Sequence, residues 1–275
     1  MTQAQSAPDA ARLQEIAADL IARAKSAGAD HAEASVAESR HTELSVRDGN
    51  LEDIERSESL DAGVRVFVGQ RQAGVAFSDL SEQGRQFTVE RAIAMAKAAP
   101  EDPFAALADP ERLCTNPPRL DLFEAVEWSP EELEAIANRV EKAARAIEGV
   151  TMTDTAFASY GQGAAAYATT TGFNSGWRKS QFGYGASVIA GKDGAMERDY
   201  AATSARRGAD LKSPEEIGTE AGERTAQRVG PQKIKSGVMP VVFDRRVATA
   251  FLSAFCGAIS GPSVARGVSF PRDKM

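Results

Sequence analysis

The stretch Leu60–Phe77, LDAGVRVFVGQRQAGVAF, decides the fold class of this chain. Apolar residues alternate with polar or small residues on both sides of Gly69-Gln70, a period of two that is typical of strands with one face on a core. A glycine in the short connection lets the chain reverse, so the stretch predicts an antiparallel hairpin. The same alternation over Ala32–Glu38 and Thr42–Val46, followed by a turn at Arg47–Asn50, predicts further strands before it.

Two predicted helices flank these strands. Apolar residues recur at helical spacing over Asp9–Ala27, where Asp9 is a suitable N-cap and Gly28 a suitable stop. A second helix is expected over Ser81–Ala99, with an apolar stripe made of Phe87, Ala92, Ile93 and Ala96. Residues 1–100 therefore predict an α+β domain in which helices flank an antiparallel sheet.

A second α+β domain is expected over residues 129–230, after a Pro- and acid-rich linker at 101–128. Ser129-Pro130-Glu131-Glu132 is a helix start, and the helix is expected to reach Ile147; a similar signature at Ser213 starts a helix that ends near Val229. Between them we expect a β-meander with Gly161-Gln162-Gly163 as one of its turns. Its predicted strands are Thr151–Tyr160, Ala164–Thr171, Gln181–Ala190 and Ala195–Ala202.

The last part of the chain, residues 231–275, predicts the beginning of a third, incomplete domain. An apolar strand is expected at Val238–Phe243, then a helix at Val247–Cys256, then the small-residue segment Gly257–Ser263. Taken together, the predicted class is α+β, with two helix-flanked sheet domains and the start of a truncated third.

Composition excludes several classes of protein. The 275 residues are 43% hydrophobic and 26% charged, with a net charge of −7, which is ordinary for a globular protein and unsuited to a nucleic-acid surface. The two cysteines, Cys114 and Cys256, do not make a disulfide framework and fit a reducing compartment. Without a basic, apolar leader or a run of membrane-spanning length, we expect a cytosolic protein with no membrane or nucleic-acid partner.

Residues that could carry chemistry are few. The only histidines, His31 and His41, are ten positions apart and lack the spacing of a zinc helix. Cys256 is interpreted as a core cysteine, because no histidine lies near it in sequence to act as its base. No phosphate-binding loop or Gly-x-Ser-x-Gly elbow is present, and the acidic run from Glu52 to Glu58 is interpreted as a solvated face.

Several groups of residues resemble the TldD/PmbA family, the gyrase modulators or microcin-processing peptidases. Two of them resemble its N-terminal domain and two its middle domain, and the last looks like the PmbA (TldE) branch rather than the TldD branch. The two groups that resemble the N-terminal domain are Asp48–Glu52 and Ser59–Val66. The two that resemble the middle domain are Ala168–Phe173 and Ala195–Tyr200. The last group is Gly257–Gly261 with Val264, Arg266 and Gly267.

The resemblance implies a subunit of a heteromeric metallopeptidase that cleaves unfolded peptides in an enclosed chamber. The TldD-type subunit of that family has a zinc-binding HExxxH helix, and the equivalent position here is Ala254, Phe255, Cys256, Gly257, Ala258, Ile259. Since this segment holds neither His nor Glu, no catalytic residue, metal ligand or cofactor is expected in this chain, and zinc is expected only in a TldD-type partner. Gly257, Ser260, Gly261 and Ser263 are candidate contacts with peptide or with the other subunit.

Family members continue well beyond this segment, so we expect a truncated product whose residues 238–275 lack most of their packing partners. Two other functions stay open at this point. One is a peptide- or protein-binding module with no role in proteolysis, and the other is an autonomous hydrolase that uses a buried pair of carboxylates.

Overall fold

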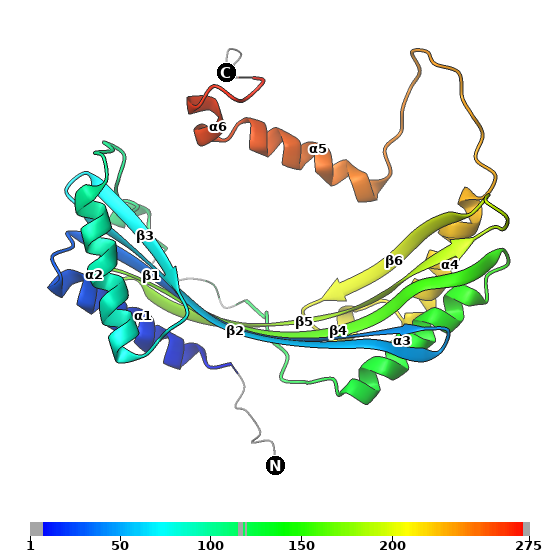
Figure 1. Ribbon diagram of the computed structural model, residues 1–275, viewed down its shortest axis with the longest axis horizontal. Coiled ribbons are helices and arrows are strands. Elements are labelled where there is room, and N and C mark those ends of the chain that lie inside the picture. The colour runs from blue at the N-terminus through cyan, green and yellow to red at the C-terminus, as the bar shows by residue number, and fades with distance from the viewer. Residues whose placement is uncertain (1–7, 115–117, 119, 272–275) are drawn as a thin grey trace. The chain divides into compact units, whose positions relative to one another are not determined.

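The computed structural model describes residues 8–114, 118 and 120–271, and the chain divides into two compact units, Met1–Gly230 and Pro231–Met275. The larger unit is mixed α+β, as predicted (Figure 1). Its helices are α1 (Ala10–Ser26), α2 (Glu82–Ala98), α3 (Pro130–Arg145) and α4 (Pro214–Arg228), with short 3₁₀ turns at Pro110–Arg112 and Gly208–Asp210. Its strands are β1 (His31–Arg47), β2 (Asn50–Val68), β3 (Arg71–Phe77), β4 (Val150–Thr169), β5 (Asn174–Ala190) and β6 (Glu197–Ala205).

All six strands form one antiparallel sheet in the order β3-β2-β1-β4-β5-β6. The hairpin predicted from Leu60–Phe77 is confirmed as the β2–β3 pair. Strand β1 pairs with β4 from Glu33↔Thr169 to Val46↔Ala156, so strands from both sides of the predicted linker share one sheet. The linker at residues 101–128 therefore does not interrupt the sheet, and the predicted domain boundaries stay a prediction.

Two predicted interruptions of strands are wrong. Residues 32–46 belong to the single strand β1, and Gly161-Gln162-Gly163 lies inside the 20-residue strand β4 rather than in a turn. A Cβ at Gly161 would lie 3.2 Å from the carbonyl oxygen of Arg40, and one at Gly163 would lie 3.1 Å from that of Glu38. These glycines allow β4 to approach β1 closely. Close approach of another backbone is, like a bend or bulge, a common reason for glycine within a strand.

Helices α1–α4 pack on one face of the sheet. Ala34 and Val36 of β1 belong to the core under α1 and α2, while Leu44 and Val46 of the same strand belong to the core under α3 and α4. All four positions have the same parity, so they point to the same side of β1. The two pairs of helices thus cover the two ends of one face (Figure 1), and we call the opposite face, against which α1–α4 do not pack, the open face.

The helix caps follow the sequence signals. Asp9, Ser129 and Ser213 accept hydrogen bonds from backbone N–H groups as N-caps of α1, α3 and α4, and the two serines complete capping boxes with Glu132 and Glu216. The predicted stripe of α2 is wrong at one position, because Phe87 is 65% exposed while Thr88 and Val89 are buried. Ala92, Ile93 and Ala96 are buried as predicted, and Thr88 and Val89 take the place of Phe87 in the first half of the buried face.

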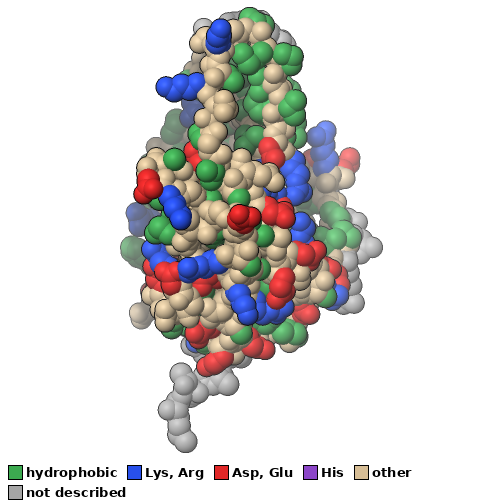
Figure 2. All heavy atoms as spheres, turned by 90° about the vertical axis from the view of Figure 1, so that its right-hand side faces the viewer, with side chains coloured by type: hydrophobic (Ala, Val, Ile, Leu, Met, Phe, Trp, Pro, Cys, Tyr) green, Lys and Arg blue, Asp and Glu red, His purple; other side chains and the backbone are tan. Residues whose placement is uncertain are grey.

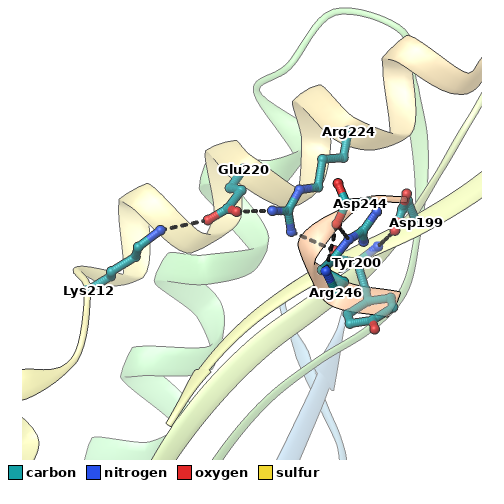
Figure 3. A network of polar contacts seen from close by, with 7 residues as sticks. All are labelled: Asp199, Tyr200, Lys212, Glu220, Arg224, Asp244 and Arg246. Carbon is teal, nitrogen blue, oxygen red and sulfur yellow. Dashed lines mark hydrogen bonds and ion pairs between the residues drawn. The ribbon is translucent and has the colours of Figure 1, made fainter. Parts of the chain in front are cut away.

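Helix α4 is fixed by its neighbours on both sides. A Cβ at Gly218 would fall on the carbonyl oxygen of Val140 in α3 and lie 2.7 Å from the Cβ of Ala143, so only glycine allows this approach. Toward β6, an ion-pair network lies along α4: Glu220 of α4 pairs with Lys212, which precedes the helix, at 3.0 Å, and with Arg224 one turn later (Figure 3). Arg224 in turn donates a hydrogen bond to the backbone carbonyl of Tyr200 in β6.

The turn between β1 and β2 is tied to α3. Asp48 and Gly49 have positive φ angles of 53° and 74°, the conformation of a two-residue hairpin turn, so the turn predicted at Arg47–Asn50 is confirmed. Their backbone N–H groups donate to the two carboxylate oxygens of Glu141, at 2.7 and 2.8 Å, and Glu141 is only 3% exposed. A buried carboxylate therefore holds the tip of a long hairpin.

The smaller unit contains α5 (Arg245–Ala258) and α6 (Gly261–Ala265). The helix expected at Val247–Cys256 is confirmed and extends two residues further at each end. The strand expected at Val238–Phe243 is wrong, because no residue of this segment is in a strand. Val238, Val241 and Val242 are all more than half exposed and have no neighbouring strand among the described residues with which to pair.

Candidate functional site

The segment predicted as the site lies at the junction of α5 and α6. Ala254 to Ala258 form the last turns of α5, Ile259 caps its end, and Ser260 precedes α6 without making a side-chain cap. Ala258 is buried and its carbonyl accepts a hydrogen bond of 2.5 Å from the buried hydroxyl of Ser269, whereas Phe255 is 58% exposed. Gly257 and Gly261 are exposed, Ser260 and Ser263 are half-buried, and their role in contacting a peptide or a subunit stays a prediction.

The donor set of this segment does not fit a zinc ion. From Val247 to Ser263 the chain contains no His, Asp or Glu, and Cys256 is the single side chain in this stretch that could bind zinc. The interpretation of Cys256 as a core residue is wrong, since it is exposed on α5. A single thiol cannot supply the three or four ligands that zinc sites in proteins use.

The histidines do not supply ligands elsewhere. His31 is the exposed first residue of β1, and the Nε2 atom of His41, on the open face, is 3.8 Å from a carboxylate oxygen of Glu43. Over the residues that the structure describes, no three His, Cys, Asp or Glu side chains cluster closely enough to hold a metal ion.

The structure brings together a polar group that sequence reasoning missed. Glu33 of β1 and Arg65 of β2 are direct cross-strand partners, with 2.7 Å between guanidinium and carboxylate. The hydroxyl of Tyr167 in β4 donates to the other carboxylate oxygen of Glu33, at 2.6 Å. Burial, and then this hydrogen bond, raise the pKa of Tyr167 to about 12, so the phenol keeps its proton at neutral pH.

This trio lies between two hollows on the open face. The first, of about 350 Å³, is lined by small residues of neighbouring strands, including Ser35, Gly63 and Gly74. The second, of about 280 Å³, is lined by Phe173 after β4 and by Leu107 and Leu113 of the segment that precedes α3. Glu33, Arg65 and Tyr167 contribute to both hollows.

The hollows offer contacts but no nucleophile with a base. Cys114 lines the second hollow, and neither histidine of the chain does, so a partnered thiol is not formed there. What they present is a fixed ion pair, an aromatic ring and exposed small residues. The alternation within β1 is a sequence signal that puts Glu33 and Ser35 on the same, polar face of the strand. That Arg65 and Tyr167 lie next to them follows only from the pairing register of β1 with β2 and β4.

On the face shown in Figure 2, acidic and basic side chains are interspersed rather than gathered in a basic patch. Among the described helices, none has both the length and the apolar character that a membrane span needs.

Comparison with known proteins gives consistent matches. Residues 32–96 match the family model described as PmbA/TldA metallopeptidase domain 1, and residues 124–229 match the PmbA/TldA metallopeptidase central domain. The metalloprotease PmbA of Escherichia coli O157:H7 is 34% identical over 247 residues, which are 90% of this chain and 55% of that relative. The chain thus spans about half the length of this relative.

Two solved structures share the fold. A candidate modulator of DNA gyrase from Bacteroides thetaiotaomicron has a TM-score of 0.85 at 21% identity, covering 95% of this chain and 60% of that one. TldE from Thermococcus kodakarensis has a TM-score of 0.73 at 16% identity, covering 94% and 58%. At these identities the likeness concerns the fold alone.

Proposed function

Because this chain belongs to the PmbA/TldD metallopeptidase family, we propose that it acts as a zinc-free, PmbA (TldE)-like partner subunit in a heteromeric cytosolic metallopeptidase. In this proposal a TldD-type subunit supplies the zinc and the hydrolytic step. The present chain completes the chamber and holds unfolded peptides in an extended form. It has no catalytic residue and no cofactor of its own.

The observation that carries the proposal is the composition of α5 and the residues after it. The residues at the position of the family's zinc helix, Ala254 to Ile259, include neither His nor Glu, and no acid or histidine occurs from Val247 to Ser263. Ala254 to Ala258 are helical, and in this proposal they correspond to the zinc helix of the TldD-type subunit with its ligands replaced. A subunit of this kind depends on another chain for catalysis.

The open face supports a role in holding peptides. Where β1 and β4 pair, its residues are small: the exposed Ala37 is opposite the half-buried Ala165, and the exposed Ser39 is opposite Gly163, which is itself buried. Small side chains leave the backbone accessible to another extended chain. The hollows around Glu33, Arg65 and Tyr167 could then receive side chains of a bound peptide.

Reconstitution with a TldD-type subunit tests the proposal. The chain purified alone is expected to bind no stoichiometric zinc, measured by mass spectrometry of the metal, and to cleave no unfolded peptide. Addition of the zinc-bearing subunit is expected to give cleavage above that of either chain alone. His31→Ala and His41→Ala are matched controls, because neither histidine belongs to a metal cluster and neither change should alter this result.

Three outcomes would contradict the proposal. Stoichiometric zinc in the isolated chain, with cleavage lost in His31→Ala or His41→Ala, would show that the chain carries its own site. Cleavage that survives a chelator but is lost on changing one acidic residue would indicate an autonomous hydrolase. Co-purification of a protein other than a TldD-type subunit, with no gain of cleavage on mixing, would favour a non-proteolytic binding module.

A further inference from the structure

Among the residues that the structure describes, strand β2 leaves a long edge of the sheet unpaired. Seven of its nineteen residues, Ala62–Val68, pair with β3, whereas the other twelve, Asn50–Asp61, pair with β1 on one side only. Within the described part of the chain, no backbone hydrogen bond joins these twelve residues to any other segment. Residues 50–59 are all exposed.

An edge of this kind can accept another strand. Twelve residues extend for roughly 40 Å, and a strand of five or six residues is enough to form a ladder. Natural edges are blocked by proline, by a very short strand, by a covering helix, by a β-bulge or by charged side chains that repel a strand of like charge. No proline occurs from Asn50 to Asp61, and β3 and α2 contact β2 at its other end, near Ala62–Val68.

The side chains along this edge are predominantly acidic. Residues 50–61 contain five acids and one basic residue, Arg56. Arg56 pairs with Glu58 at 3.1 Å, and Glu52 pairs with Arg47 at 2.8 Å.

The charge of the edge is only partly compensated. Asp53, Glu55 and Asp61 make no ion pair among the described residues. Glu55 also lies directly opposite Glu43 of β1. The edge therefore combines unpaired backbone groups with uncompensated negative charge.

We propose that the unpaired edge of β2 binds an extended, lysine- or arginine-rich peptide segment as an additional strand. Backbone hydrogen bonds would hold the segment, as in other cases of β-augmentation, and its cations would neutralise Asp53, Glu55 and Asp61. A second copy of this chain is a poor occupant, because like charges on adjacent strands repel. The inference rests on the peptide-holding role proposed above and names the edge and the class of peptide.

Peptide binding to the complete chain, without a second subunit, tests this inference. The probe is a fluorescent twelve-residue peptide in which Lys and Thr alternate, compared by anisotropy with a matched Glu and Thr peptide. The lysine peptide is expected to bind at least about tenfold more tightly, since a few exposed charge pairs together contribute about 1.4 kcal/mol. The same peptide N-methylated at two consecutive central residues should lose binding. Successive N–H groups of a strand point to opposite edges, so the two methyl groups remove one backbone donor from each edge of the peptide, including the edge that faces β2.

A charge-reversed protein gives the matched comparison. Asp53→Lys combined with Glu55→Lys should weaken the lysine peptide at least about tenfold and strengthen the glutamate peptide. Glu148→Lys combined with Glu223→Lys changes the net charge equally at exposed positions outside β2 and should leave both affinities unchanged. Circular dichroism and the thermal midpoint verify that both variants are folded.

Three results would overturn the inference: no binding of the lysine peptide, equal binding after N-methylation, or equal loss in the two charge-reversed proteins. The second would show a purely electrostatic contact, and the third an effect of net charge. Failure here is distinguishable from failure of the proposed function. Reconstituted cleavage with a TldD-type subunit could persist without edge binding, and edge binding could persist without reconstituted cleavage.

Discussion

Helix α4 has a polar composition but is buried along one face, whereas helix α5 has an apolar composition but is largely exposed. Helix α4, PEEIGTEAGERTAQR, is rich in charge, yet Ile217, Gly218, Ala221, Gly222 and Thr225 are buried along one face. Helix α5, RRVATAFLSAFCGA, is much more apolar, yet Ala258 is its one buried residue. Phe251 and Leu252, for example, are 54% and 67% exposed.

The difference teaches that the burial of a helix depends on its neighbours more than on its own hydrophobicity. Helix α4 is enclosed by α3 and the sheet, so a narrow apolar stripe is enough. Helix α5 presents large apolar side chains to solvent, and exposed patches of this kind commonly mark interaction surfaces. That surface agrees with the proposal of a partner subunit.

The largest expected difference in the free energy of unfolding is between truncation of a core residue of α4 and truncation of an exposed residue of α5. Ile217 is 1% exposed, so Ile217→Ala should lower the free energy of unfolding by about 3 kcal/mol through lost burial and a cavity. Phe251→Ala, at a residue 54% exposed, should change it by less than about 0.5 kcal/mol. Urea denaturation followed by circular dichroism measures both, and equal losses would contradict the comparison.

The glycines of the two helices give the next largest effect. Gly218→Ala should destabilise the protein by about 2 kcal/mol, because its Cβ would force α4 away from Val140 and Ala143 of α3. Gly257→Ala in α5 should instead stabilise its helix by up to about 1 kcal/mol, since nothing lies within 4 Å of the added Cβ. Thermal unfolding of the two variants should therefore shift in opposite directions, and a shift in the same direction would refute the assigned packing.

A third test extends the comparison to α3, the neighbour of α4. Glu141→Ala removes the carboxylate that accepts from the N–H groups of Asp48 and Gly49, and should cost about 1.5 kcal/mol. Glu223→Ala, at an exposed position of α4, is the matched control and should be nearly neutral. Faster amide hydrogen exchange at the hairpin tip in Glu141→Ala alone would support the assignment; unchanged exchange would contradict it.

The smallest effect concerns the open face. The pKa of Tyr167 is raised from 10.0 to about 12 in the folded state, so the folded protein retains a phenolic proton that the unfolded chain loses. The resulting stabilisation is fully present below about pH 10 and is lost as the pH rises toward about 12. The difference in unfolding free energy between wild type and Tyr167→Phe should therefore shrink over this interval. Phenolate absorbance during an alkaline titration should confirm that Tyr167→Phe removes one late-ionising group.

Local signals predicted the elements well. The caps at Asp9, Ser129 and Ser213 and the turn at Asp48-Gly49 depend on side chains within three residues, so sequence alone locates them. The interruption predicted at Gly161-Gln162-Gly163 failed because a strand glycine that permits close approach has the same local sequence as a turn glycine. The candidate contacts at Gly257 and Ser260 were reached by resemblance, and their role is still a prediction.

The sequence by itself determined the α+β class, the hairpin at Leu60–Phe77, the helix starts and the absence of zinc ligands from the α5 segment, because each depends on residue type and short spacing. Only the tertiary structure decided that all six strands share one sheet, that Glu33, Arg65 and Tyr167 meet, and that β2 has an unpaired acidic edge. These features depend on register between strands that are far apart in the chain. For the same reason the polar helix α4 is buried while the apolar helix α5 is exposed: burial is a property of neighbours, which no local pattern specifies.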